Sequence, residues 1–357
     1  MRAVVLALVF LALPSPARAT PRIDVYTMGT GDDLFSAFGH AAICVTDEQR
    51  WPYGRCYNYG TADFTTPLPL TWNFIRGRAL FWVSTMNAGQ MLRYYASVGR
   101  QVWRQTLPLS PEEATRVADA LEASAQENAK YYRYHHFNDN CTTRIRDVVD
   151  RATGGRLSRD PTDAGKTFRQ WARGGFGGNV GMLMVNDLLL GRPADRRTNS
   201  WQAMFLPSQL RLELQKRFGA TPAIVIVGRP WPKPGATWLG SAAFVVLGAL
   251  LALAIAAHLR TGRALAAFVL GLVGLVLWLL AVLSSFPELR QNELLLSFWP
   301  SDFALPWLGA RYLRARLIAL AIVVVAHVGL FVQPIAPTLM VLLPMVALAI
   351  RTSWRRG

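Results

Sequence analysis

The sequence predicts an α+β domain followed by a helical membrane region. Strand-like alternation and helix-like spacing of apolar residues are interspersed before residue 229. Four apolar segments follow residue 238, and the 357-residue chain is 52% hydrophobic, which is more than ordinary soluble proteins contain. We therefore expect a domain at residues 20–228, a linker at residues 229–237 and a transmembrane region at residues 238–357.

Residues 1–19 have the features of a secretory signal peptide. Arg2 supplies a positive charge, residues 4–13 form a short apolar run, and Ala17-Arg18-Ala19 is a small-x-small cleavage site. An uncleaved anchor is the alternative. Either reading places the domain on the periplasmic or extracellular side of the membrane.

The charge of the domain is mildly positive. The whole chain has a formal net charge of +16; once Arg2 and Arg18 are left out, the part before residue 238 retains +8. Such an excess suits an anionic membrane surface. The domain lacks runs of Lys and Arg, so we exclude nucleic acid as a partner.

The domain is expected to begin with strands. Residues 23–28 alternate, and residues 40–46 and 55–60 read as a hairpin across a turn at residues 51–54. If Cys44 lies opposite Cys56, the two cysteines are able to form a disulfide, as is common in exported proteins.

The same register gives Asn58 a position on the face of the sheet that carries His40. It sets Ala42 opposite Asn58 and His40 opposite Gly60. The Asn58 amide is therefore a candidate to orient the imidazole of His40, and Asp63 is the competing choice.

Strands and helices then alternate up to residue 140. Residues 65–70 read as a proline-containing turn, and Ser110-Pro111-Glu112-Glu113 is a capping box that opens a helix. The other expected elements are a strand at 79–86, a helix at 88–98 and a strand at 101–109.

A helix is expected to start at Cys141. Cys141, Ile145, Val148 and Val149 form one apolar stripe, and Asn140 is a good N-cap residue. Unpaired N–H groups and the helix dipole favour a thiolate at this position. If Cys44 and Cys56 pair, Cys141 is left as a free thiol in an oxidising compartment, which favours a chemical role over simple packing.

His40 is the candidate base and acid for Cys141. Backbone N–H groups at the helix start, around Asn140 and Thr142, are the candidate oxyanion donors. His135 and His136 are adjacent and lack a further ligand at metal spacing, so we expect no metal or cofactor.

The C-terminal part is expected to cross the membrane about four times. The apolar segments are residues 238–258, 264–283, 317–332 and 337–350. Basic residues between the first two segments agree with a cytoplasmic turn, but four spans put the basic tail at 351–356 outside, against the positive-inside rule. Residues 287–316 are expected to lie at the membrane interface, facing the Cys/His site.

Several spaced motifs occur in order along the chain. They are Phe38-Gly39-His40-Ala41, Tyr57-Asn58-Tyr59-Gly60, Phe74-Ile75-Arg76-Gly77, Asn140-Cys141-Thr142-Thr143-Arg144-Ile145-Arg146-Asp147, Leu190-Gly191 to Asp195, Phe205-Leu206-Pro207 and the loop at 292–300. Together they resemble the Lnb N-terminal periplasmic domain family. The resemblance implies a circularly permuted papain-like (NlpC-type) thiol domain and a lipoprotein N-acyltransferase, with a lipoprotein N-terminus and membrane lipid as partners.

Acyl transfer through a Cys141 thioester, with an amine as acceptor, is the function that these residues favour. A cysteine peptidase or amidase acting on cell-wall peptides uses the same pair but does not need several membrane spans. A non-catalytic membrane sensor or scaffold would tolerate Cys141→Ser, whereas a nucleophile would not.

Overall fold

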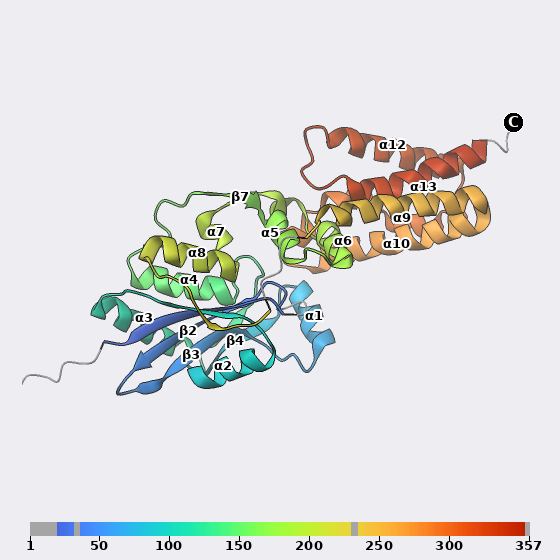
Figure 1. Cartoon of the computed structure of the whole chain (residues 1–357). Coiled ribbons are helices and arrows are strands. Elements are labelled where there is room, and N and C mark those ends of the chain that lie inside the picture. Colours follow the sequence, from blue (N-terminus) through green and yellow to red (C-terminus); the bar gives the residue numbers. More distant parts are fainter. Residues whose placement is uncertain (1–19, 32–35, 230–234, 354–357) are drawn as a thin grey trace, which may run out of the picture.

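A computed structural model shows a mixed α+β domain beside a bundle of helices (Figure 1). The structure describes residues 20–31, 36–229 and 235–353, so the expected leader and most of the expected linker lie outside the described residues. The strands are β1 Arg22–Met28, β2 His40–Asp47, β3 Trp51–Thr61, β4 Leu80–Asn87, β5 Val102–Thr106, β6 Tyr131–Arg133, β7 Asp163–Thr167, β8 Arg197–Asn199 and β9 Ala223–Ile226.

The α+β class predicted from the sequence is confirmed. The helices of the domain are α1 Pro67–Ile75, α2 Ala88–Ser97, α3 Pro111–Ser124, α4 Cys141–Ala152, α5 Phe168–Gly175, α6 Val180–Leu189, α7 Ser200–Ala203 and α8 Pro207–Phe218. Those after the linker are α9 Trp238–Ala257, α10 Leu259–Leu283, α11 Pro287–Arg290, α12 Ala310–Ala326 and α13 Ala336–Ser353.

The core of the domain is an antiparallel sheet with helices on both faces. Its strand order is β6-β4-β3-β2-β1-β5-β9. Helices α3, α4 and α8 cover one face and α2 covers the other (Figure 1). The central strand β2 is apolar along most of its length because side chains pointing to either face become buried.

The register expected for β2 and β3 is observed. Cys44 pairs with Cys56 across the two strands, and their sulfur atoms form a disulfide. The turn lies earlier than expected: residues 51–54 belong to β3, and the Asp47 carboxylate accepts hydrogen bonds from the backbone N–H groups of Gln49 and Arg50. The reason is the local Asx-type turn that Asp47 stabilises.

Helix α1 replaces most of the turn expected at residues 65–70. Pro67 lies in the first turn of the helix, where backbone N–H groups make no intrahelical hydrogen bonds. Its lack of an N–H group therefore costs no hydrogen bond there. Proline there therefore starts a helix.

Two of the four expected membrane segments are helices long and apolar enough to span a bilayer, namely α9 and α10. The third differs from expectation, because α12 begins seven residues before position 317 and carries Arg311, Arg314 and Arg316. The fourth corresponds to the shorter apolar helix α13. The bundle exposes large apolar side chains, which suits a lipid environment.

The chain between α10 and α12 runs back along α10. The Trp278 indole donates to the Phe298 carbonyl at 3.1 Å, and the Arg263 guanidinium donates to the carbonyls of Leu305 and Leu308. A Cβ atom on Gly271 would lie 2.6 Å from the ring of Phe303, so glycine permits this close approach. Residues 287–316 thus differ from the expected interfacial loop, since only their first part lies near the domain.

This return changes the direction of the last two helices. The described C-terminal end lies at the same end of the bundle as the turn between α9 and α10 (Figure 1). Arg351 therefore lies at the same end of the bundle as Arg260.

A buried ion pair holds the returning segment against α12. Asp302 and Arg316 are fully buried, and their closest oxygen and nitrogen atoms are 2.8 Å apart. The Tyr312 hydroxyl also donates to Asp302, at 2.8 Å. Each charged side chain therefore has a charged partner in place of water, as a buried charge requires.

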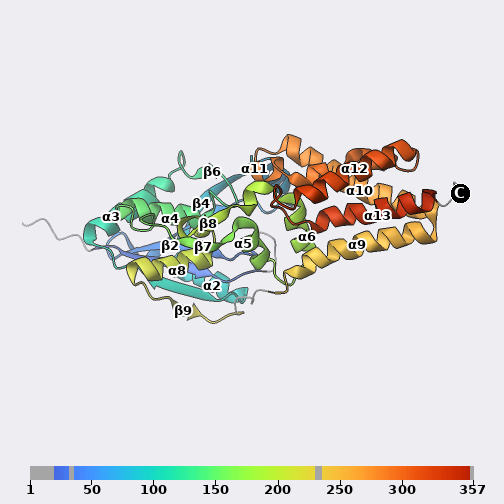
Figure 2. The same cartoon turned by 90° about the horizontal axis from the view of Figure 1, so that it is seen from above.

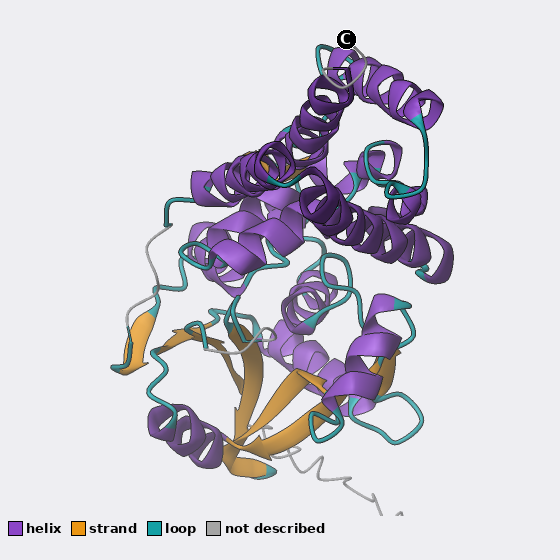
Figure 3. Ribbon diagram, turned by 90° about the vertical axis from the view of Figure 1, so that its right-hand side faces the viewer, coloured by secondary structure: helices purple, strands orange, loops and turns teal. Residues whose placement is uncertain are grey.

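The domain and the bundle share a hydrogen-bonded junction. The Asn292 amide donates to the Leu188 carbonyl at 2.7 Å, and the Gln333 amide donates to the Leu190 carbonyl at 3.0 Å. Helix α6 is the helix of the domain that lies next to α9 (Figure 2). The described part of the bundle consists of helices and loops, and the strands belong to the domain (Figure 3). This junction fixes one end of the domain against the bundle.

We expect Asp302→Ala to destabilise the protein by about 3 kcal/mol, because it leaves the Arg316 charge buried without its partner. Thermal unfolding in detergent micelles measures this. The matched control is Asp163→Ala, which breaks the exposed pair with Arg197 and should lower the stability far less. Equal effects of the two variants would contradict the role of the buried pair.

Candidate active site

Asn140 fixes the start of helix α4. Its Oδ1 atom accepts hydrogen bonds from the backbone N–H groups of Thr142 at 2.9 Å and Thr143 at 3.0 Å. Its Nδ2 atom donates to the carbonyls of His136 at 2.9 Å and Phe205 at 3.0 Å. The side chain is therefore the N-cap of the helix, and Cys141 is the first helical residue, as expected from the sequence.

This cap changes which groups are available to hold an oxyanion. Both hydrogens of the Asn140 amide and the N–H group of Thr142 are already used inside the protein, so in this state neither residue offers the expected donor. Among the hydrogen bonds of the described residues, the backbone N–H of Cys141 has no acceptor. That N–H group lies next to the thiol and is the available donor at the start of α4.

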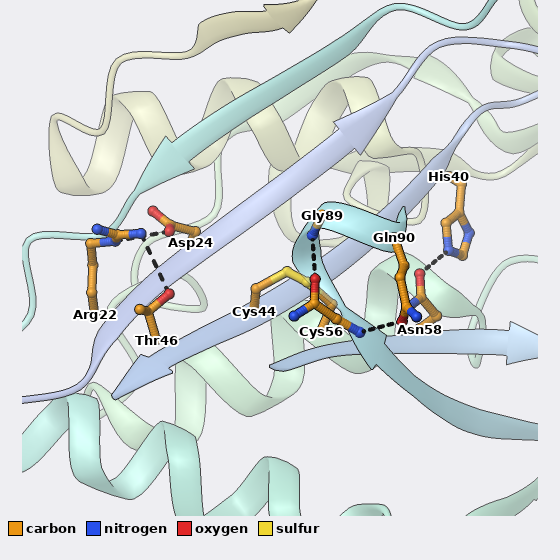
Figure 4. The surroundings of a disulfide bond; sticks show 10 residues. Arg22, Asp24, His40, Cys44, Thr46, Cys56, Asn58, Gly89 and Gln90 are labelled. Carbon is orange, nitrogen blue, oxygen red and sulfur yellow. Dashed lines mark hydrogen bonds and ion pairs between the residues drawn. A yellow bond between two sulfur atoms is a disulfide. The ribbon is translucent and has the colours of Figure 1, made fainter. Parts of the chain in front are cut away.

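His40 and Asn58 lie together on adjacent strands. His40 is the first residue of β2, and its Nε2 atom is 3.4 Å from the Oδ1 atom of Asn58 on β3 (Figure 4). This contact leaves Nδ1 of His40 for the thiol. Asp63 lies instead in an exposed turn, where its carboxylate accepts hydrogen bonds from Thr65 and Thr66.

The environment of Cys141 favours its thiolate. Burial raises the pKa of the thiol, but the charge of His40 and a hydrogen bond from its side chain outweigh burial. Hydrogen bonds from Thr142 and from the backbone N–H of Ala41 act in the same direction, and the pKa falls to about 7. A substantial fraction of Cys141 is then ionised near neutral pH.

Two neighbours of the site were not identified as such from the sequence. The Tyr95 ring from α2 stacks on the His40 ring, with centroids 6.3 Å apart. Gly60 has a φ of +87°, and a Cβ atom on it would lie 3.3 Å from the Cβ of Cys141. The conformation and the close approach both favour glycine. The expected pairing of His40 with Gly60 pointed to this position, whereas no local signal pointed to Tyr95.

His135 and His136 face the bundle and not the thiol. The His135 Nε2 atom lies 3.7 Å from Glu288, and both His rings contact the Phe286 ring. Burial lowers the pKa of His136 to about 3, so its ring is neutral. Among the described residues, no group of three or more His, Cys, Asp and Glu side chains is arranged to hold a metal ion.

The arrangement brings together a nucleophile, a base and an orienting group. Cys141 supplies an ionisable thiol, His40 is able to accept and return a proton, and the Asn58 oxygen restrains the imidazole. Such a set is suited to forming and resolving a thioester.

Comparison with known proteins gives one result. The family described as the Lnb N-terminal periplasmic domain matches residues 19–174, which include His40, Asn58 and Cys141. No curated protein and no solved structure matches the chain. The resemblance predicted from the motifs is thereby confirmed for residues 19–174.

The rate of Cys141 alkylation should rise with pH with a midpoint near 7, because the thiolate is the reacting form. His40→Ala should move the midpoint upward, since burial remains while the opposing charge is lost. Iodoacetamide kinetics from pH 5 to about 10 measure both midpoints. His258→Ala, at an exposed histidine in the bundle, is the control and should leave the midpoint unchanged. An alkaline midpoint in the unmodified protein would contradict the thiolate–imidazole interaction.

Gly60→Ala should slow Cys141 alkylation several-fold, because the added methyl group pushes against the Cys141 side chain. Gly99→Ala is the matched control: Gly99 has a φ of +65°, and a Cβ there meets no atom within 4 Å. Both variants should lose about 1 kcal/mol of stability through backbone strain. If alkylation slows equally in both, strain and not the contact with Cys141 is responsible.

Proposed function

Because residues 19–174 belong to the Lnb N-terminal periplasmic domain family, we propose that the protein is a membrane-bound thiol acyltransferase that makes lyso-form lipoproteins. In this reaction an acyl chain moves from an ester to an amine. The ester belongs to the lipoprotein itself when the lyso form results, whereas a phospholipid donor would leave both ester-linked chains of the lipoprotein in place. The acceptor is the α-amine of the lipoprotein's N-terminal cysteine.

The observation that carries the proposal is the free thiol of Cys141 beside His40. The other two cysteines of the chain form a disulfide, so Cys141 is the free cysteine of an exported domain. Burial raises the pKa of this thiol, but the interaction with His40 lowers it to about 7. Cys141 is therefore available as a nucleophile at neutral pH.

The first half of the reaction acylates the thiol. The Cys141 thiolate attacks the ester carbonyl, and the backbone N–H of Cys141 donates to the oxyanion that forms. The carbon–oxygen bond then breaks, and the alcohol leaves with the proton held by His40. The product is a thioester on Cys141 and a lipid or lipoprotein that has lost one ester-linked chain.

The second half transfers the acyl chain to the amine. The amine attacks the thioester while neutral His40 accepts its proton, and the carbon–sulfur bond breaks to release the thiolate. Asn58 accepts a hydrogen bond from Nε2 of His40 and so keeps Nδ1 directed at the reacting groups. The same residues thus serve both halves.

The proposal includes a circularly permuted papain-like fold. Three features support it: the order His before Cys, the cysteine at a helix N-terminus, and the histidine with its amide partner on neighbouring strands. The proposal also includes several membrane passes, with the domain on the periplasmic side and the turn at His258 in the cytoplasm. Helices α9 and α10, the apolar surface of the bundle and the shared end of Arg260 and Arg351 support it.

The test uses the full-length protein in membranes with a diacylated lipoprotein. Mass spectrometry of the N-terminal lipopeptide should show an amide-linked acyl chain and the loss of one ester-linked chain. Cys141→Ala should abolish this product, and His40→Ala should reduce its rate by about 10² to 10⁴-fold. His258→Ala is the matched control and should retain the activity.

Two other outcomes would contradict the proposal. Cleavage of cell-wall peptides that depends on Cys141, with the lipopeptide unchanged, would identify a cysteine peptidase or amidase. Full function in a Cys141→Ser variant would identify a sensor or scaffold.

A further inference from the structure

We propose that the exposed face of α1, formed by Leu68 and Trp72, lies in the headgroup region of the membrane that α9 and α10 cross. This inference concerns an interaction surface and its partner, a lipid surface. It depends on a membrane location for α9 and α10 and not on the proposed acyl transfer.

Helix α1 has two apolar faces, and the domain covers only one of them. Leu70 is 8% exposed in the core of the domain, and Phe74 contacts the rings of Tyr134 and Phe286. Leu68 and Trp72 are four positions apart, so they share a helix face, and they are 81% and 48% exposed. An apolar face of this kind needs a partner or a lipid surface.

The end of α10 places α1 at the level of the membrane surface. The Ser284 hydroxyl, directly after α10, donates to the Ile75 carbonyl at 2.6 Å. The Ser285 hydroxyl donates to the Arg76 carbonyl at 3.0 Å. An α-helix rises about 1.5 Å per residue. The 25 residues of α10 are therefore longer than the roughly 30 Å hydrocarbon core, and the residues after Leu283 lie at its boundary.

The position of α1 beside the bundle leaves its outer face accessible to lipid. Helix α1 lies at the end of the domain nearest the bundle and to one side of the bundle axis (Figure 1). The Arg76 guanidinium lies 5.5 Å from the centroid of the Trp72 ring, and Arg78 is exposed nearby. Tryptophan beside arginine is typical of the interfacial region, where the indole meets headgroups and the cation meets phosphate.

The contact would hold the active site close to the lipid. Phe74 on the inner face of α1 lies 6.1 Å from the ring of His136, centroid to centroid. The His136 carbonyl in turn accepts a hydrogen bond from Asn140, the cap of the helix that begins with Cys141. A short chain of contacts thus connects the lipid-facing helix to the start of α4.

The test labels single cysteines with an environment-sensitive fluorophore. Leu68→Cys and Tyr53→Cys are each made in a Cys141→Ala chain, and the Cys44–Cys56 disulfide does not take the label. Tyr53 is the matched control, because it is 80% exposed on the same domain but lies at the far end of β3 from Gly60. The full chain is reconstituted in phosphatidylethanolamine and phosphatidylglycerol vesicles that contain nitroxide-labelled lipid.

The label at position 68 should be quenched several-fold more by the nitroxide lipid than the label at position 53, and less by aqueous iodide. Equal quenching at the two positions would overturn the proposal. A second measurement keeps Cys141: brominated lipids should quench less fluorescence in Trp72→Phe than in the unmodified protein. If the two proteins are quenched equally, Trp72 does not contact lipid.

Discussion

The rest of the structure depends on the hydrogen bonds that the Asn140 side chain makes at the start of α4. They join the cap of the helix to the carbonyl of His136 in the preceding loop and to that of Phe205, so two distant parts of the chain meet beside Cys141. The apolar stripe of α4 then packs against the sheet and brings Cys141 beside Gly60 on β3. His40 begins the neighbouring strand, so the alignment of α4 with the sheet sets the distance between thiol and imidazole.

The domain and the bundle function as one unit in the proposed reaction. Hydrogen bonds from Asn292 and Gln333 attach the segment around Leu188 to the bundle, and Ser284 attaches α1. The site is thereby held at a fixed position relative to α9 and α10. An enzyme whose ester and amine substrates are both anchored in the membrane gains from such attachment, because it keeps the thiol where the substrates lie.

Local patterns predicted much of the domain. The N-cap Asn140, the capping box at Ser110 and the pairing of Cys44 with Cys56 rest on neighbouring residues, and the structure contains all three. The free thiol, the histidine and the amide were found in the same way, and the structure brings them together. Their catalytic roles are still predictions.

The features that sequence reasoning missed depend on contacts between distant residues. The stacking of Tyr95 on His40 joins α2 to β2, and the use of Asn140 as a donor depends on the Phe205 carbonyl. The path of the chain back along α10 depends on the pair of Asp302 with Arg316 and on a glycine at position 271. A hydropathy pattern records none of these contacts, which is why the sequence alone left the side of the basic tail open.

The central claim is that Cys141 carries the acyl chain between donor and acceptor. The most direct measurement incubates the protein with an ester donor that bears a labelled acyl chain, omits the amine, and determines the mass of the protein. The account predicts one acyl group on Cys141 that hydroxylamine removes and that an added amine acceptor discharges. An unmodified Cys141, in a preparation that nevertheless transfers the chain to the amine, would contradict it.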